Sequence, residues 1–426
     1  MPTANKKGRW KAMGNLKITK EQIEKIVDEN VDEALELLVN ALQTPSPTGA
    51  ENLMGETMCR WLDKVGIKYN VYTYNNNQPN IIAELSGDGE KSFVFNGHMD
   101  VFPGYDNENS DYNPWSGEIK DGKIYGRGAS DMKGGNCAAF MAMHLLNKLG
   151  WKPAGKVLLT LVSDEERGGK YGTLSLIKEG LIKADYGISM EPSGFQTCVN
   201  HGGVYPFKVT VYGDGGIASE DVPNSEIDSF NVYGGEDAIH KIVKAVYALD
   251  ELNKNIIRKR KNVRGMISHM SITNIHGGTP NVINNHCREA FLLIDRRYIP
   301  GETPESIRTE IVDALEGVKK YDPYFVYKVE GPVEPDCPFL DIAEDSIVVE
   351  ALDRAHEELF GGKTVHRTML AGSDAAYISK YCNTNIPWFG PGAHEYGIAA
   401  KDEYIPIENY INCIKMYMHV LIDIMS

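Results

Sequence analysis

Apolar residues recur at helical spacing over residues 20–62, behind a short polar N-terminal segment. Ile23 and Val27, for example, lie four residues apart, an interval that places both side chains on one face of a helix. Pro45 and Pro47 lack the main-chain N–H that a helix interior needs. The pattern therefore predicts one or two helices that are interrupted at these prolines.

Short apolar runs then alternate with helical patterns up to residue 179. We predict strands at residues 81–85, 92–96 and 157–163, and helices at residues 134–149 and 172–179. Alternation of strands and helices is typical of an α/β protein, in which helices cover both faces of a sheet. The expected fold class is α/β, with a mixed, mostly parallel sheet covered by helices.

The pattern changes near Val204. Residues 205–212 alternate like a strand with one exposed face, and residues 213–235 are rich in glycine and acidic residues without clear periodicity. Further elements are predicted as helices at residues 238–252, 304–315 and 346–359, and as strands at residues 266–275, 288–296 and 386–389. The helix at residues 346–359 and the strand at residues 386–389 follow a proline-rich break and resume the strand–helix alternation of the first part.

These changes divide the chain into a discontinuous domain and an insertion. Residues 1–15 form a polar tail that we expect to be disordered. Residues 16–202 and 331–426 are expected to build the domain that carries the chemistry. Residues 203–330 are expected to form a smaller α+β domain inserted into it.

Composition narrows the classes of function. The 426 residues exceed what one compact core usually spans, which agrees with two domains. The formal net charge of −15 argues against a nucleic-acid partner, because phosphate backbones are bound by clustered Lys and Arg. The N-terminal segment lacks the apolar core of a signal peptide, and no window reaches the roughly 18 consecutive apolar residues of a membrane span. We therefore expect no nucleic-acid partner, no membrane contact and a cytoplasmic location.

The seven cysteines are scattered along the chain and include no C-x-x-C pair. Reduced thiols are the simplest interpretation, and a structural zinc site built on cysteine is not expected. Any metal ion must then be held by histidine and carboxylate side chains.

Polar residues follow several of the predicted strands directly. In sheets of this class, ligands bind just beyond the carboxyl ends of the strands. The residues found there, or in the glycine-rich segment 126–135, are His98, Asp100, Asp131, Glu165, Glu166 and Glu191. One imidazole and several carboxylates form the donor set that holds zinc or a similar divalent ion. The sequence therefore favours a metal site at this edge of the sheet.

Each of these residues has a simpler interpretation when it is taken alone. A histidine after a strand is more often a capping residue, and Glu165 with Glu166 would suit the acidic first turn of a helix. An interpretation of all the carboxylates as solvated strand ends stays open, although the joint pattern makes it improbable. In a metal site, Asp100 could accept the ring N–H of His98 that faces away from the metal. One glutamate left free beside the metal could act as general base.

The same segments resemble a family of metallopeptidases and deacylases that includes acetylornithine deacetylase, succinyl-diaminopimelate desuccinylase, aminoacylase and glutamate carboxypeptidase. The resemblance runs from about residue 23 to the C-terminus. Its most specific stretches are residues 97–100, 125–135, 163–168, 190–192, 277–282, 294–302, 372–374 and 389–392. It implies a metal-dependent hydrolase that cuts an amide bond in an N-acyl amino acid or a small peptide-like substrate.

The resemblance also implies a site with two metal ions. Asp131 would bridge the ions, His98 and Glu191 would complete the ligands of the first, and Glu166 would hold the second. The expected metal is zinc, with cobalt or manganese as alternatives. Paired ions of this kind generate hydroxide near neutral pH and polarise the scissile carbonyl.

Further roles follow from the same resemblance. Glu165 would be the general base, and Asp100 would orient the metal-binding histidine. Arg297 would bind a carboxylate of the substrate, a task that suits a guanidinium because it grips a carboxylate with two hydrogen bonds. Asn281 and Ser373 lie in matching segments and are expected to contact the substrate. The inserted domain would cap the site and form the interface of a homodimer.

Two expected histidines are missing. The family places a ligand of the second ion four residues before a glutamate near the C-terminus, and here Ala399 precedes Glu403 at that distance. His394 is the candidate to replace it. A second histidine, which stabilises the oxyanion from the cap, is expected close to Ile217. His276 is the reserve candidate for that role.

Two functions therefore remain in competition. The intact carboxylate set, with its general base, favours an active amidohydrolase that is a deacylase or peptidase. The missing histidines favour a catalytically impaired or one-metal relative that binds a ligand or partner in the same cleft. Metal content measured together with turnover separates the two.

Overall fold

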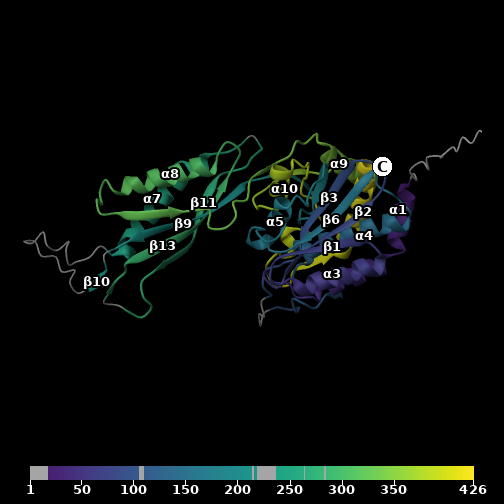
Figure 1. Ribbon diagram of the computed structural model, residues 1–426, viewed down its shortest axis with the longest axis horizontal. Helices are drawn as coiled ribbons and strands as arrows, with labels where there is room; N and C mark the ends of the chain where they lie inside the picture. Colours follow the sequence, from purple (N-terminus) through teal and green to yellow (C-terminus); the bar gives the residue numbers. More distant parts are fainter. Residues whose placement is uncertain (1–17, 105–109, 214, 218–236, 263, 283–284) are drawn as a thin grey trace, which may run out of the picture.

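The computed structural model describes residues 18–104, 110–213, 215–217, 237–262, 264–282 and 285–426 (Figure 1). The expected tail at residues 1–15 and most of the glycine-rich segment 213–235 lie outside the described residues.

Three helices open the described chain, α1 (Lys20–Asp28), α2 (Val31–Leu42) and α3 (Asn52–Val65). The prediction allowed at most two, because it placed the interruption only at the prolines. Thr19 caps the start of α1 by accepting a hydrogen bond from the main chain of Gln22. At the break before α2, the side chain of Asn30 donates to the carbonyl of Ile26, 2.6 Å away. Local polar contacts therefore end α1 without any proline.

A five-stranded sheet runs through the larger body of the protein, in the order β1-β2-β6-β3-β7. Its strands are β1 (Lys68–Asn75), β2 (Gln78–Ser86), β3 (Lys91–His98), β6 (Gly155–Val162) and β7 (Tyr186–Ser189). The strand β3 pairs in parallel with β6 and β7, whereas β2 pairs antiparallel with β1 and β6. The carboxyl ends of β6, β3 and β7 therefore meet at one edge. The predicted mixed α/β class is confirmed.

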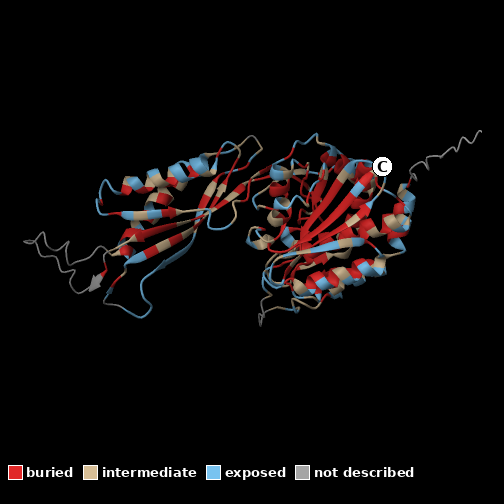
Figure 2. Cartoon of the chain, viewed as in Figure 1, coloured by how far each residue is buried: buried red, intermediate tan, exposed pale blue. Residues whose placement is uncertain are grey.

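Helices cover both faces of this sheet. Phe93 and Phe95 of β3 pack into the core with α4 (Gly134–Lys148) and α11 (Ile407–Met425), whereas Val94 between them packs with α5 (Thr173–Lys178) and α10 (Ala375–Cys382). The helix α9 (Ile347–Phe360) contributes side chains to both cores. Figure 2 shows the central strands as the most continuously buried part of this body. A strand that is buried on both faces reads as an apolar run, which explains why the sequence revealed it.

A second body is built on an antiparallel sheet in the order β11-β13-β9-β14 (Figure 1). Its strands are β9 (Gly203–Tyr212), β11 (His269–Gly277), β13 (Glu289–Tyr298) and β14 (Val326–Glu330). The helices α7 (Ala238–Asn255) and α8 (Pro304–Val318) pack with the buried residues of this sheet into a separate core. The role of this body as a cap and dimerisation unit stays a prediction.

Short elements complete the described chain. They are the strands β4 (Glu118–Lys120), β5 (Lys123–Tyr125), β8 (Thr197–His201), β10 (Gly216–Ile217), β12 (Asn285–His286), β15 (Leu340–Asp341), β16 (His366–Met369) and β17 (Tyr404–Pro406), and the helical turns η1 (Ala129–Lys133), η2 (Glu165–Arg167), η4 (Ile257–Lys259) and η5 (His394–Tyr396). The strand predicted at residues 386–389 is reduced to isolated bridges, in which Trp388 pairs with Ser189 and Cys198. Within the described ranges, no helix has the length and apolar character needed to cross a bilayer.

The helix α11 is anchored by a buried hydrogen bond from Tyr417 Oη to the carbonyl of Phe389, 2.7 Å away. We expect Tyr417→Phe to lower the free energy of unfolding by about 1–3 kcal/mol, because the carbonyl is left buried without a donor. Tyr381→Phe is the control, since Tyr381 is 52% exposed and should change stability by less than about 0.5 kcal/mol. Urea unfolding followed by far-UV circular dichroism measures both. Equal midpoints for the two variants would contradict the assignment.

Candidate metal centre

The candidate residues meet where β6, β3 and β7 end. His98 is the last residue of β3, and Glu191 follows β7 by two residues. Glu165 and Glu166 lie in the turn η2 that follows β6, and Asp131 lies in η1. Because the three strands are parallel and adjacent, their ends bring together side chains that are up to 93 residues apart in the sequence (98 to 191).

The imidazole of His98 is at the centre of this cluster. Its Nε2 lies 3.2 Å from Asp131 Oδ1, 3.9 Å from Glu165 Oε2 and 3.9 Å from Glu191 Oε2. Two sets of potential ligand atoms each lie within 4.8 Å of one another, one from His98, Asp131 and Glu166 and the other from His98, Glu165 and Glu191. The histidine belongs to both sets.

The other ring nitrogen of His98 fixes the direction of the ring. Nδ1 lies 2.8 Å from the main-chain carbonyl of Asp100 and 3.6 Å from its carboxylate. The expectation that the Asp100 carboxylate accepts the ring N–H is therefore corrected, because the carbonyl oxygen is the nearer acceptor. In a ring that binds a metal through Nε2, the remaining proton would lie on Nδ1 and be donated to this carbonyl. The Asp100 carboxylate instead accepts hydrogen bonds from the main-chain N–H groups of Glu165 and Glu166, at 3.1 and 3.2 Å.

Burial and mutual repulsion disfavour the ionised form of these carboxylates. Burial, together with the charges of neighbouring acidic groups, raises the pKa of Glu165 and Glu191 well above the usual range and that of Glu166 to about 10. Burial also raises the pKa of Asp374 to about 7. Burial alone would lower the pKa of His98, but the contact with Asp131 and the charges of the surrounding glutamates raise it well above its ordinary value.

The donor set fits divalent cations. Glu166 Oε1 is buried and has no hydrogen-bond partner among the described residues, so this acceptor is left without a positive group. Nitrogen and carboxylate oxygen donors from four side chains suit zinc and similar ions. A bound cation would favour the ionised form of these carboxylates, because its attraction for each of them outweighs their mutual repulsion.

Arg127 and Glu403 hold the main chain that carries Asp131. Glu403 Oε1 accepts hydrogen bonds from the N–H groups of Ser130 and Asp131, at 3.0 and 3.1 Å. Its Oε2 lies 2.7 Å from Arg127 Nη1, and both side chains are buried. The sequence gives Glu403 only as a marker for the expected histidine, and Arg127 carries no signal beyond its place between two glycines. Both are residues of the site that sequence reasoning missed.

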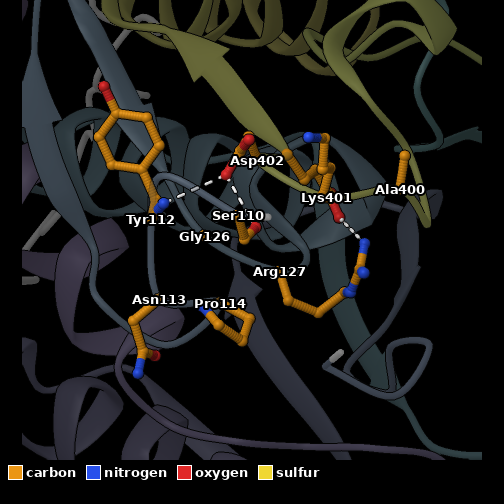
Figure 3. A pocket seen from close by; sticks show the side chains of 10 residues that line it. Ser110, Tyr112, Asn113, Pro114, Gly126, Arg127, Ala400, Lys401 and Asp402 are labelled. Atoms are coloured by element: carbon orange, nitrogen blue, oxygen red, sulfur yellow. Dashed lines mark hydrogen bonds and ion pairs between the residues drawn. The ribbon is translucent and has the colours of Figure 1, made fainter. Parts of the chain in front are cut away.

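The loop before Glu403 is fastened to a second segment. Asp402 Oδ1 accepts hydrogen bonds from Ser110 Oγ at 2.9 Å and from the main-chain N–H groups of Asp111 and Tyr112 at 3.0 and 3.1 Å. Figure 3 shows Asp402 pointing toward Ser110 and Tyr112, with Arg127 on the other side of this small pocket. The C-terminal loop and residues 110–114 therefore hold Asp131 in place together.

His394 and Ala399 mark the side where the second ligand was expected. His394 is exposed and borders the same cavity as Asp131 and Glu166, but it belongs to neither set of close ligand atoms among the described residues. The residue before it, Ala393, exchanges two hydrogen bonds with Ser130 Oγ, at 2.9 and 3.1 Å. Ala399 does not border the cavity, whereas Ile398 does. The residue that borders the cavity next to the expected ligand position is therefore the apolar Ile398.

A cavity of about 900 Å³ opens from the cluster toward the second body. Arg297 borders it, and its guanidinium is already engaged by Asp295, with Nε 2.9 Å from Oδ1 and Nη2 2.9 Å from Oδ2. Ser373 borders it as well, and its Oγ lies 3.3 Å from Nε2 of the buried His201. Burial lowers the pKa of His201 to about 4, so this imidazole is neutral and its Nε2 accepts a hydrogen bond from the hydroxyl of Ser373. No pattern in the sequence indicated a functional role for His201.

The remaining candidates lie at the far end of the second body. Asn281 follows β11. The last residue of β11 pairs with Ala290 of β13, and Arg297 lies seven residues further along β13. Seven residues of strand span roughly 23 Å, so Asn281 is remote from the cavity of its own chain. The backbone of Ile217 pairs with that of Asn285, at the same end. His276 is exposed there and stacks on Phe291 at a ring distance of 4.8 Å.

Several known proteins are similar to this chain in sequence or in fold. The relative N-formyl-4-amino-5-aminomethyl-2-methylpyrimidine deformylase of Halalkalibacterium halodurans is 28% identical over 402 residues, which cover 88% of this chain and 91% of the relative. Succinyl-diaminopimelate desuccinylase of Ehrlichia chaffeensis is 30% identical over 356 residues, which cover 80% and 84%. A dinuclear metal-binding peptidase of Bacillus subtilis shares the fold with a TM-score of 0.65 at 16% identity, and the superposition covers 93% of this chain and 99% of that protein.

The family assignment rests on the larger part of the chain. The family model described as Peptidase family M20/M25/M40 matches residues 94–423, a stretch that begins in β3 and includes every candidate ligand. The chain therefore belongs to the peptidase family M20/M25/M40.

Proposed function

We propose that this chain is a metal-dependent amidohydrolase that cleaves an N-acyl amino acid or a small peptide-like substrate. The observation that carries the proposal is the convergence of one imidazole and four carboxylates on two overlapping sets of ligand atoms at the edge of a parallel sheet. Membership of a family of amide-cleaving hydrolases supports it.

The proposed metal centre holds two ions. His98 and Glu191 would hold the first ion, Asp131 would be shared by both, and Glu166 would hold the second with its otherwise unpartnered Oε1. The dinuclear peptidase of Bacillus subtilis supports this count. Zinc is the proposed metal, with cobalt or manganese as alternatives. Divalent ions in such a site lower the pKa of water and polarise a carbonyl group.

Glu165 is the proposed general base. It borders the cavity with 15% of its side chain exposed, so water and substrate reach it. Its main-chain N–H is held by Asp100, which fixes the origin of its side chain. In the reaction, Glu165 takes a proton from the attacking water and passes it to the leaving nitrogen.

A one-metal or catalytically impaired protein is the second candidate function. The observation in its favour is the apolar wall at Ile398, beside the alanine that stands at the expected ligand position. His394 is the proposed replacement ligand for a second ion. Ala393, which precedes it, is hydrogen-bonded to Ser130, which precedes Asp131, so the two segments are held side by side. Three ligands from His98, Asp131 and Glu191 alone would still make a catalytic zinc arrangement.

Arg297 is the proposed anchor for a substrate carboxylate, and Ser373 a further contact. Substrate binding at Arg297 then requires that Asp295 release part of the guanidinium. The deformylase of Halalkalibacterium halodurans, whose substrate is an N-formyl pyrimidine, makes N-formyl amides worth testing beside N-acetyl and N-succinyl amino acids.

We also propose a cytoplasmic homodimer, in which Asn281 serves the cavity of the partner chain. The seven free thiols are typical of a reducing compartment. Ile239, Val243 and Tyr247 form an exposed apolar stripe at four-residue intervals on α7, and β11 is an edge strand of its sheet. An apolar helix face beside an open strand edge suits burial against a second copy.

The first test compares metal content with turnover. Wild-type protein purified without chelator and then supplied with zinc should hold two ions per chain and hydrolyse at least one member of a panel of N-formyl, N-acetyl and N-succinyl amines. Glu165→Ala should lower kcat by about 100- to 10,000-fold while the ion count stays at the wild-type value. Atomic absorption and amine release give the two readings. Unchanged turnover in Glu165→Ala would remove the assigned base, and two-ion protein without turnover on the whole panel would favour the binding function.

The second test concerns the anchor. Arg297→Ala should lower kcat/KM about 10- to 100-fold for a substrate with a carboxylate, because a charged hydrogen-bond pair is lost. The same substrate with its carboxylate converted to an amide should be hydrolysed equally by both proteins. Arg367→Ala is the matched control, since Arg367 is a second guanidinium on the wall of the same cavity. Equal losses for both substrates would contradict the assignment.

The third test asks whether Asn281 acts across the dimer. Asn281→Ala and Glu165→Ala should each lose activity alone. A mixture that exchanges subunits should recover about a quarter of the wild-type activity, because half of the dimers are mixed and each mixed dimer contains one intact site. Activity of the mixture is measured after refolding the two variants together. A mixture no more active than its components would exclude action across the interface.

A further inference from the structure

A buried carboxylate that takes no part in the proposed chemistry lies behind the metal centre. Glu51 immediately precedes α3, and its side chain is 0% exposed. Its Oε2 accepts the main-chain N–H of Gly49 at 3.0 Å. Its Oε1 accepts the side-chain amide of Gln78 and the main-chain N–H of Asp164, both at 3.2 Å. Glu51 therefore reaches the turn that carries Glu165.

Asp100 binds the same turn at the next two residues. Its carboxylate accepts the N–H groups of Glu165 and Glu166, and Thr48 Oγ1 donates to it at 3.0 Å. Three consecutive main-chain N–H groups, at residues 164, 165 and 166, are thus bound by two buried carboxylates. Thr48 and Gly49 in turn bind these carboxylates, so residues 48–51 and the turn form one connected network.

The turn depends on this support because its own geometry is unfavourable. Asp164 has φ +70°, a left-handed conformation that costs a non-glycine residue roughly 1–2 kcal/mol. The N–H groups at the start of a helical turn also have no partner within the turn. The Asp164 carboxylate accepts the N–H of Tyr171 at 3.0 Å and so holds the other end of the loop.

We propose that Glu51 is a positioning residue, which directs Glu165 and Glu166 into the metal centre by binding the N–H of Asp164. The role rests on the proposed function of these two glutamates. Without Glu51, the peptide before Asp164 loses its acceptor, and rotation of that peptide moves the origin of both side chains. A displacement of about 1 Å at a reacting group lowers the rate by about 100-fold.

Only the second ion depends on this turn. Glu166 is its proposed ligand, whereas His98 ends β3 and Glu191 follows β7, and the hydrogen bonds of Glu51 go to Gly49, Gln78 and Asp164. Loss of Glu51 is therefore expected to weaken the second ion and leave the first in place. A purely structural role would lower stability without separating the two ions.

Two variants and one control test the proposal in the full-length protein. Glu51→Ala removes every acceptor, and the isosteric Glu51→Gln keeps one oxygen and fills the same volume, so that folding is preserved. Asp322→Ala is the control, because Asp322 is also a buried carboxylate that accepts a main-chain N–H, from Tyr324 at 3.2 Å, but belongs to the second body. Thermal unfolding verifies that the variants are folded.

Amide hydrogen exchange gives the primary reading, because it needs neither metal nor substrate. Exchange at residues 164–166, followed by mass spectrometry, should be at least about 10-fold faster in Glu51→Ala than in wild type and intermediate in Glu51→Gln. In Asp322→Ala it should equal wild type. Unchanged exchange in Glu51→Ala would overturn the proposal.

Zinc titration and kinetics give the second reading. In Glu51→Ala the second zinc should bind about 10- to 100-fold more weakly with the first unchanged, and kcat should fall about 100-fold while KM stays within about threefold. Faster exchange with unaltered zinc binding and kcat would also overturn the proposal. If wild type binds zinc but turns over no substrate, the zinc titration still decides the role of Glu51, and only the proposed function fails. If wild type binds no zinc, the proposed function fails, and the exchange reading alone decides whether Glu51 holds the turn.

Discussion

Repulsion among buried carboxylates is the constraint on which the arrangement of this protein depends. Glu165, Glu166, Glu191 and Asp131 surround a single imidazole, and burial together with the charges of acidic neighbours raises the pKa of the three glutamates. Such a cluster keeps its shape only if the main chain beneath it is rigid. Parallel strands supply the spacing, and buried acceptors that bind main-chain N–H groups supply the orientation.

Two carboxylate supports illustrate how this rigidity is achieved. Glu403, neutralised by Arg127, holds the main chain at Asp131, and Asp100 holds the turn at Glu165 and Glu166. In both places an acidic side chain binds main-chain N–H groups, and Glu403 also binds the guanidinium of Arg127. The candidate metal ligands therefore stay directed at one another although their charges favour separation.

The sequence predicted those parts of the molecule that depend on local pattern. The strands β3 and β6 read as apolar runs because both faces are buried, and residues directly after them could be recognised as candidate ligands. Glu403 and Arg127 could not be assigned roles, because their pairing joins positions 276 residues apart. The remote place of Asn281 could not be predicted either, since it follows from the register between β11 and β13. The break between α1 and α2 escaped prediction because it depends on side-chain bonds at Asn30 and Thr19.

The ion pair between Asp295 and Arg297 has a consequence for selectivity. Asp295 is a competitor tethered two residues away, so its effective concentration at the guanidinium is far higher than that of any small anion in solution. An anion such as acetate or phosphate that binds the guanidinium alone has only those hydrogen bonds with which to displace the carboxylate of Asp295. A ligand that also makes contacts elsewhere in the cavity can add their free energy to the exchange. At the proposed anchor, the carboxylate of Asp295 would therefore favour ligands that carry further groups into the cavity over small free anions.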